Sequence, residues 1–328
     1  MTSFYLLRFA LGVAEAGFFP GIILYFTYWF PREHRTRIVS LFMTAVPIAT
    51  VIGAPVSGAL LGLHGLAGIE GWRWLFIIEG APAVLLGAAA LFFLIDRPKD
   101  AAWLTAGERS ALEQRFAAEA EETERHGLAG IGQALTNPRI LVLGLIYFCL
   151  VIGLYGIGFW MPQVLQTFGL SHLTIGFLTA IPYLVATVGM VLAGQHSDAT
   201  AERIWHVALP LLVAGAAFTW SAGAGPLVLV MLALSIATLG IYAAIGTFWS
   251  LPTSILTGTG AAAGLALINS IGNCGGFVGP FAVGRLKGAT GDFTAALLFL
   301  AGSLALGGAL ALYFRYAEHS RVRNARGV

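Results

Sequence analysis

Charged side chains are scarce in this sequence. Only 10% of its 328 residues are Asp, Glu, Lys or Arg, whereas about 25% is usual for a soluble globular domain. Apolar residues make up 58% of the chain, and the mean hydropathy is +0.82. These values exclude a soluble globular protein and predict an all-α polytopic membrane protein.

Cysteine is rare, and the common motifs for metal, nucleotide or covalent chemistry are missing. Cys149 and Cys274 lie in apolar runs without metal-ligand spacing, so neither a metal site nor a disulfide framework is predicted. The sequence contains no Walker A, H-E-x-x-H or G-x-S-x-G pattern and no basic stripe for nucleic acid. We therefore expect no enzymatic activity, no cofactor, no nucleic-acid partner and no ATP-driven pumping.

Nine apolar runs are long enough to cross a bilayer as helices. They cover residues 4–30, 38–62, 72–95, 139–166, 173–194, 204–222, 227–251, 261–284 and 293–316. With the 31–37 loop inside, fourteen Lys and Arg residues fall in cytoplasmic segments and three in outer loops. By the positive-inside rule, this asymmetry predicts a multi-pass protein of the inner cell membrane with a cytoplasmic carboxyl terminus.

Charges concentrate between the third and fourth runs. Residues 96–125 hold thirteen of the 34 charges in the chain, which comprise 18 basic and 16 acidic side chains. This predicts a bundle of three spans over residues 1–95, a cytoplasmic linker over 96–138, and a six-helix bundle with a basic tail over 139–328. Thr105 and Glu108 have capping-box spacing, which predicts a surface helix from about residue 106 to 125.

An arginine and a glutamate interrupt the first apolar run. Arg8 and Glu15 are seven residues apart, which is almost two helical turns, so both side chains leave the helix on nearly the same face. Glu15 would lie near the middle of the bilayer, where a carboxylate costs roughly 2.5–3.5 kcal/mol. One hypothesis is a proton-titratable glutamate beside an anion-binding arginine. The other is that Arg8 reaches the headgroups and Glu15 is a structural hydrogen-bonding group.

Five segments together resemble one transporter family. They are LRFALGVAEAGFFP (7–20), WRWLFIIEG (72–80), FWMPQ (159–163), FWSLP (248–252) and ALINSIGNCGGFVGP (266–280). This set is similar to the major facilitator superfamily, and within it to the anion:cation symporter family of organic-acid permeases. Members have twelve transmembrane helices, and the nine runs look like the fourth to the twelfth, without the first three.

The resemblance implies roles for particular residues. It assigns carboxylate binding to Arg8 and proton coupling to Glu15, with polar substrate contacts from Asn269 and Asn273. Trp249 would line the same cavity, although membrane tryptophans are more often interfacial anchors, and Tyr155 would add a hydroxyl or simply pack. The segment from Gly194 to Asp198 resembles a gating loop that closes the cytoplasmic side.

The resemblance implies a secondary transporter that imports a small organic anion with protons by alternating access, working as a monomer when full length. The family handles aromatic acids, sugar acids, tartrate-like dicarboxylates and nicotinate-like compounds, so the anion itself is left open. The alternative hypothesis is an amino-terminally truncated, transport-inactive membrane fragment of such a permease.

Overall fold

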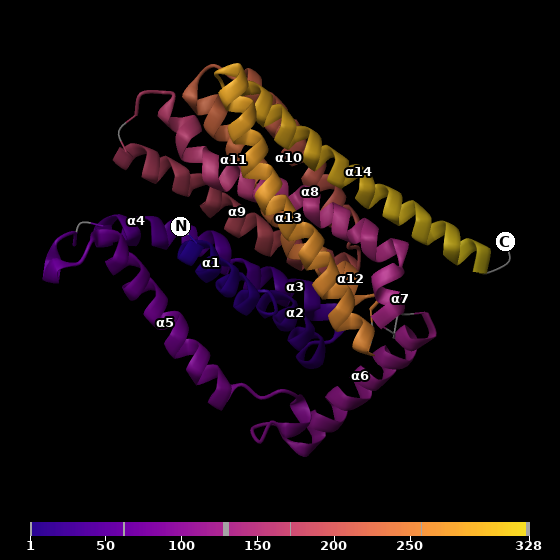
Figure 1. The fold of residues 1–328 in the computed structure, drawn as a ribbon. Helices are drawn as coiled ribbons and strands as arrows, with labels where there is room; N and C mark the ends of the chain where they lie inside the picture. The colour runs from indigo at the N-terminus through magenta and orange to yellow at the C-terminus, as the bar shows by residue number, and fades with distance from the viewer. Residues whose placement is uncertain (1, 62, 127–130, 171, 257, 326–328) are drawn as a thin grey trace.

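The structure is a computed structural model that describes residues 2–61, 63–126, 131–170, 172–256 and 258–325. These residues are almost all helical, and none of them lies in a β-strand (Figure 1). The helices of the first part are α1 (Thr2–Glu15), α2 (Phe18–Trp29), α3 (Arg32–Met43), α4 (Ala45–Leu61), α5 (Gly71–Phe93), α6 (Ala106–His126) and α7 (Ile131–Thr136). The second part contains α8 (Pro138–Gln166), α9 (His172–Thr200), α10 (Trp205–Gly223), α11 (Leu227–Phe248), α12 (Ser250–Thr253), α13 (Gly258–Thr290) and α14 (Thr294–Ala325). Two 3₁₀ turns, Leu66–Gly68 and Pro98–Asp100, flank α5.

Nine helical spans within the described residues are long and apolar enough to cross a membrane. They coincide with the nine predicted runs, which confirms the all-α polytopic fold class. Several ends differ from the prediction, because an apolar run marks the part of a helix that prefers lipid rather than the whole helix. The run predicted over residues 261–284, for example, belongs to the 33-residue helix α13.

Two of the predicted continuous spans are interrupted by short turns. The first breaks at residues 16 and 17, between α1 and α2, and the second breaks at Thr44, between α3 and α4. A proline follows each break, Pro20 in α2 and Pro47 in α4. Because proline has no N–H, it cannot donate to the carbonyl four residues earlier, and its ring crowds that carbonyl. These carbonyls belong to Ala16 and Met43, at the two breaks.

Helices α8 to α14 form the packed body of the molecule, in which α13 lies against α8, α14 against α10, and α11 against α9 and α10 (Figure 1). Close approach of α13 to α8 depends on glycine. A Cβ added at Gly279 would lie 2.7 Å from the Ile152 carbonyl oxygen, which is well inside van der Waals contact. Lipid supplies no hydrophobic force to hold membrane helices together, so their association depends on close packing. Small residues permit this packing because they let the two backbones approach.

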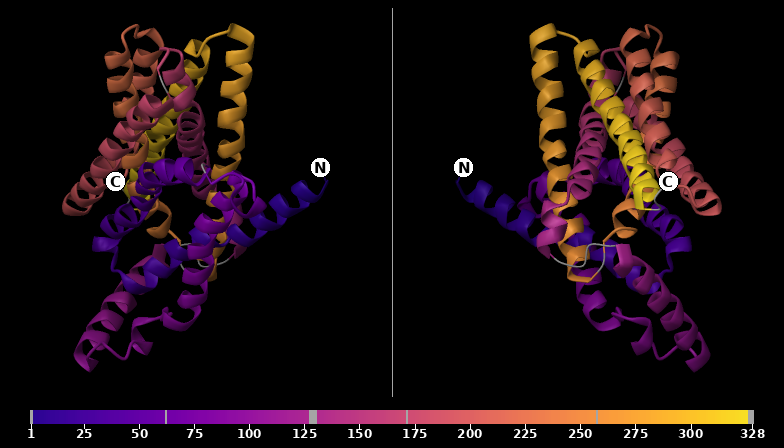
Figure 2. Two further views of the ribbon diagram at one scale, coloured as in Figure 1. Left: turned by 90° about the vertical axis from the view of Figure 1, so that its left-hand side faces the viewer. Right: turned by 90° about the vertical axis from the view of Figure 1, so that its right-hand side faces the viewer.

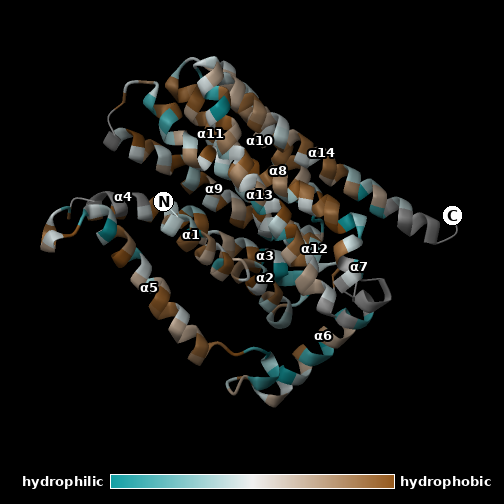
Figure 3. Ribbon diagram, viewed as in Figure 1, coloured by the Kyte–Doolittle hydropathy of each residue, from teal (hydrophilic) through white to brown (hydrophobic). Residues whose placement is uncertain are grey.

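Helices α1 and α5 are much less covered by protein than the α8–α14 body. No residue of α1 is buried, and α1 projects away from the body in both views of Figure 2. The most apolar stretch of α5 contains no buried residue, and α5 is mainly hydrophobic beyond its first turns, in contrast to the hydrophilic α6 (Figure 3). An apolar helix of this kind requires lipid or further protein around it.

Helix α6 is the predicted surface helix, and its first turn has the predicted cap. The Thr105 N–H and hydroxyl donate to Glu108 Oε2 at 2.9 and 2.8 Å, and the Glu108 N–H donates back to Thr105 Oγ1 at 3.3 Å. These bonds stabilise the Glu108 carboxylate and lower its pKa. The division into two bundles and a linker stays a prediction.

Candidate functional site

The two charged residues of the first span are exposed on α1. Within the described part of the chain, neither Arg8 nor Glu15 takes part in an ion pair. The Arg8 guanidinium lies over the Phe4 ring, 5.8 Å from its centroid, on the same helix. Glu15 is the last residue of α1. The structure therefore does not bring this pair together with the polar residues predicted on α13, and their roles stay predictions.

The predicted polar residues of the second part lie along the contact between α8 and α13. Asn269 is buried, whereas Asn273 is exposed one turn later and donates from Nδ2 to the Asn269 carbonyl at 2.9 Å. Tyr155 of α8 is 40% exposed, and its ring borders Gly276, three residues beyond Asn273. Asn273 and Tyr155 are thus both accessible, on the two helices that pack together here, and their substrate contacts stay predictions.

Trp249 lies between the first and second parts of the chain. It is fully buried at the junction of α11 and α12. Its ring meets Phe19 of α2 edge-on at 4.9 Å and Tyr147 of α8 at 4.8 Å. In this structure Trp249 is therefore part of an aromatic contact that joins α2 to the α8–α14 body, and lining of an open cavity stays a prediction.

Helix α3 is seated on α9 and α11 through small side chains. Gly194 of α9 faces Ser40 of α3 so closely that an added Cβ would lie 2.6 Å from Ser40 Cβ. Ser40 also borders Gly246 of α11, where the corresponding distance from an added Cβ to Ser40 Oγ is 2.8 Å. One turn away, the Thr36 and Ser250 hydroxyls form a buried hydrogen bond of 2.6 Å. We call this contact, made by Thr36, Ser40, Gly194, Gly246 and Ser250, the α3 seat.

Asp198 extends the α3 seat with charge. Its Oδ2 accepts a 2.6 Å hydrogen bond from the Arg37 backbone N–H on α3, and its Oδ1 forms a 2.6 Å ion pair with Arg203. The Asp198 and Arg203 side chains are only 10% and 16% exposed. One carboxylate therefore connects α3 to the turn that follows α9.

The prediction that Gly194 to Asp198 form a loop is wrong. Both residues lie inside α9, which continues to Thr200. The apolar run ends near Gly194, but no helix breaker follows it until Ala201, whose φ of 51° lies in the left-handed region. A left-handed residue commonly ends a helix. Residues 194–198 thus form a polar stretch near the carboxyl-terminal end of α9. Their gating role stays a proposal.

Helix α6 is fastened to the start of α3. Arg35 is 5% exposed, and its Nη2 donates to the Phe30 carbonyl at 3.1 Å and to Glu119 of α6 at 3.3 Å. The other Glu119 oxygen accepts from the Arg32 N–H at 2.8 Å, and Arg115 pairs with Glu33 at 2.6 Å. We call this end of the molecule, where α6 meets α3, the connector end.

A cleft of about 480 Å³ opens at the connector end beside Asp198. Its lining residues come from α3 and α9 and carry both signs of charge: Glu33, His34, Arg37, Gln195, Asp198 and Ala199. The cleft gives water access to the edge of the α3 seat. Its mixed charges do not select an anion or a cation.

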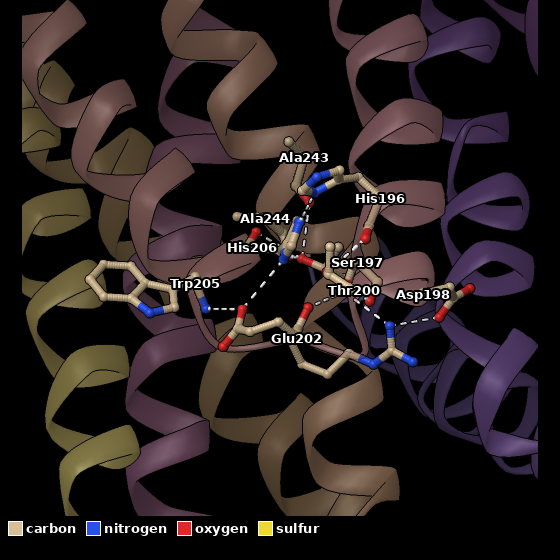
Figure 4. A network of polar contacts seen from close by, with 11 residues as sticks. His196, Ser197, Asp198, Thr200, Glu202, Trp205, His206, Ala243 and Ala244 are labelled. Atoms are coloured by element: carbon tan, nitrogen blue, oxygen red, sulfur yellow. Dashed lines mark hydrogen bonds and ion pairs between the residues drawn. The ribbon is translucent and has the colours of Figure 1, made fainter.

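A chain of polar contacts links the end of α9 to the start of α10 (Figure 4). His196 Nδ1 lies 2.7 Å from His206 Nε2, and His206 Nδ1 lies 3.4 Å from Glu202 Oε2. The Glu202 carboxylate also accepts from the Trp205 N–H at 2.8 Å, which holds the first turn of α10. Ser197 links these contacts to the Asp198–Arg203 pair, because its hydroxyl donates to the Glu202 carbonyl and accepts from Arg203.

Sequence reasoning missed most of this end of the molecule. Thr36 and Ser40 are four residues apart, which places them on one helical face, and this spacing could have marked them as a packing stripe. Nothing in the sequence relates Ser250 to Thr36, or His206 to His196, because these contacts exist only after the helices pack.

The chain belongs to the Major Facilitator Superfamily, whose family model matches residues 1–280. The family and its relatives are transporters, so the chain is not an enzyme. A protein from Agrobacterium vitis named "Putative tartrate transporter" is 50% identical over 95% of this chain and 69% of its own length. A "Quinolone resistance transporter" from Acinetobacter baumannii is 38% identical over 97% of this chain and 74% of its own length.

A solved structure shares the fold. The proton:xylose symporter XylE superimposes with a TM-score of 0.68 at 17% identity, covering 89% of this chain and 66% of XylE. The chain therefore spans about two thirds of the length of these proteins.

Proposed function

We propose that the chain works in a transporter that imports a small organic anion together with protons across the bacterial inner membrane by alternating access. The observation that carries this proposal is the 50% identity to a bacterial protein named for tartrate transport, over nearly the whole chain. Tartrate is a dicarboxylate, so the substrate class is a small carboxylate. The connector end is the cytoplasmic side in this proposal, in line with the predicted distribution of Lys and Arg.

The α3 seat supports the alternating-access part of the proposal. It joins helices from the first and second parts of the chain through hydrogen bonds, one carboxylate and small residues, so it can close one side of a transport path. Opening would separate Thr36 from Ser250 and Arg37 from Asp198. Water already reaches the edge of this contact through the cleft.

Arg8 and Glu15 are the proposed substrate and proton sites. A guanidinium offers a planar fork of donors that fits a carboxylate, which a lysine ammonium does not. A nearby glutamate exchanges a proton as the arginine changes partners. Both side chains are exposed here, so in this proposal α1 packs against further protein when substrate is bound.

Uptake of radiolabelled tartrate into proteoliposomes, with and without an inward proton gradient, tests the proposal. Glu15→Gln should uncouple uptake from the gradient while exchange persists, and Arg8→Lys should lose most uptake. Glu70→Gln and Arg73→Lys are the matched controls, because these residues form an exposed ion pair of 3.3 Å at the start of α5, and the substitutions should leave uptake unchanged. Gradient-driven uptake that survives in Glu15→Gln would refute the coupling role.

Two other results would replace the proposal. Export of a quinolone without carboxylate uptake would favour the activity named for the Acinetobacter relative. The absence of any transport by folded, membrane-inserted protein would favour the hypothesis that these residues do not transport by themselves.

A further inference from the structure

His196 and His206 form a pair of contacting imidazole rings at the corner between α9 and α10 (Figure 4). Their ring centroids are 5.0 Å apart, and the nitrogens in contact are 2.7 Å apart. His206 reaches Glu202 with its other ring nitrogen at 3.4 Å. The three side chains thus form a short line from His196 through His206 to a carboxylate.

The contact between the two rings limits how many protons the pair can hold. A ring nitrogen of neutral histidine either donates or accepts, whereas both nitrogens of the cation donate. In the uncharged pair, His196 Nδ1–H donates to His206 Nε2, and His206 Nδ1–H donates to Glu202. With one proton added, a His206 cation donates to both neighbours, and both bonds become charge-assisted. A second proton would place two N–H groups and two positive charges against each other, so it is excluded while the contact holds.

The surroundings let a proton reach the pair. His196 is exposed, and the His206 and Glu202 side chains are 16% and 32% exposed. Helix α11 packs behind the pair with uncharged residues, and its Thr247 hydroxyl donates to the His206 carbonyl at 2.9 Å. The charged groups that face the corner are Glu202 and Arg203 of the turn, Asp198 of α9, and Arg315 of α14, which stacks on Trp205 at 5.2 Å.

The pair is connected to the α3 seat through the turn after α9. The Ser197 hydroxyl donates to the Glu202 carbonyl at 2.6 Å and accepts from Arg203 Nη1 at 3.1 Å. Arg203 holds Asp198, and Asp198 holds the Arg37 N–H of α3. A change in the position of Glu202 is therefore passed to the carboxylate that bridges the two parts of the chain.

We propose that His196, His206 and Glu202 form a proton-binding site that takes up one proton while the α9–α10 corner is intact, and that a second proton breaks the corner and releases α3 from α9. Histidine changes charge between about pH 5 and 8, so acidification supplies the second proton. The site is separate from Glu15, which lies on α1. The proposal rests on the proposed function only in taking the α3 seat as the gate.

The first test counts the protons directly. The full chain in lipid nanodiscs, with ¹⁵N-labelled histidine, is titrated by NMR. The pair should take up its two protons in two separate steps, with one cationic and one neutral ring in between, because two N–H groups cannot face each other across the 2.7 Å contact. In His206→Gln, His196 should titrate in a single step, and His64→Gln, at the opposite end of the molecule, should leave both steps unchanged. Two independent titrations at similar pH in the wild type would overturn the proposal.

The second test measures the α3 seat. Spin labels are placed at Leu41 of α3 and Leu192 of α9, both exposed, after Cys149 and Cys274 are replaced. The distance should lengthen on acidification from pH 7.5 to 5 in the wild type, and it should stay short in His196→Gln, which keeps a donor but cannot become a cation. His34→Gln is the matched control, because His34 lines the cleft beside Asp198.

A pH response that persists in His196→Gln, or that disappears in His34→Gln, would assign the effect to other groups and overturn the proposal. Neither measurement needs substrate or transport. A failure here therefore leaves the proposed transport function untouched, and a failure of the uptake assay leaves this proton site untouched.

Discussion

Removal of the Asp198 carboxylate should shift the protein toward separation of α3 from α9. The carboxylate makes two short contacts, but only the hydrogen bond from the Arg37 N–H crosses between α3 and α9. The ion pair with Arg203 stays within one part of the chain when α3 leaves. We call the state with α3 on α9 closed and the state with the two helices apart open. Loss of the Arg37 hydrogen bond alone should therefore shift the open–closed equilibrium, whereas the free energy of unfolding should reflect the loss of both contacts.

The size of this shift follows from the chemistry of that hydrogen bond. A bond to a charged group contributes roughly 1.5–3 kcal/mol, so Asp198→Ala should change the open-to-closed ratio by roughly 10- to 150-fold. Asp198→Asn keeps an acceptor but not the charge, which about halves the strength of the bond. Its expected effect is about 1 kcal/mol, or roughly five-fold.

Double electron–electron resonance between labels at Leu41 and Leu192 measures the two populations in nanodiscs. Glu318→Ala is the matched control, because Glu318 pairs with Arg139 at 2.9 Å between α8 and α14, within one part of the chain. That variant should lose stability without changing the distance. An unchanged distance distribution in Asp198→Ala would refute the argument that this carboxylate holds α3 in place.

Three further predictions concern other parts of the molecule. Gly194→Ala should also separate α3 from α9, because overpacking destabilises the closed contact by about 1–3 kcal/mol. Adding Ser40→Gly should restore the short distance between the labels at Leu41 and Leu192, because it removes the atoms that oppose the new methyl group. No rescue would mean that the clash lies elsewhere. After Cys149 and Cys274 are replaced, an impermeant thiol reagent applied to intact cells should label Leu66→Cys but not Ala117→Cys, and the reverse result would invert the topology. The neighbouring Gly65 is not substituted, because its φ of 89° disfavours any side chain. Because the pKa of Glu108 is lowered in the folded helix, its capping contribution is present above the unfolded pKa and is lost as pH falls through the folded value. Protection of the first-turn amides of α6, measured as the ratio of intrinsic to observed hydrogen-exchange rates, should therefore fall below about pH 4.3. Glu108→Gln, which cannot ionise, should remove this pH dependence, whereas Thr105→Ala should only weaken it, because the backbone N–H of residue 105 still donates to Glu108.

The sequence was sufficient to predict the elements that depend on local chemistry. Apolar length predicted nine spans, and the Thr105–Glu108 spacing predicted the start of α6. The breaks before Pro20 and Pro47 were also encoded locally, but the hydropathy pattern passes through them, because the residues on both sides are equally apolar. Hydropathy reports preference for lipid and does not report where a hydrogen-bond ladder stops.

The candidate site was less predictable, because it is built from contacts between distant helices. Thr36 and Ser250 are 214 positions apart, and neither is unusual in its own helix. The family resemblance alone marks Asp198, and it predicts a loop there, whereas α9 continues through this residue to Thr200. For Arg8 and Glu15, helical spacing places the side chains on one face but does not say what that face meets.

In the proposed transport cycle, the composition of the α3 seat affects how fast this contact opens and closes. No large side chain from α3 is locked into a pocket of α9 at Gly194 or of α11 at Gly246; the surfaces meet through a serine and two glycines. Parting Ser40 from these two glycines withdraws no bulky side chain at either point, and the hydroxyls of Thr36 and Ser250 can each bond to incoming water. Such a contact can separate and re-form many times in the same register. While it is open, water replaces the hydrogen-bond partners of the two hydroxyls.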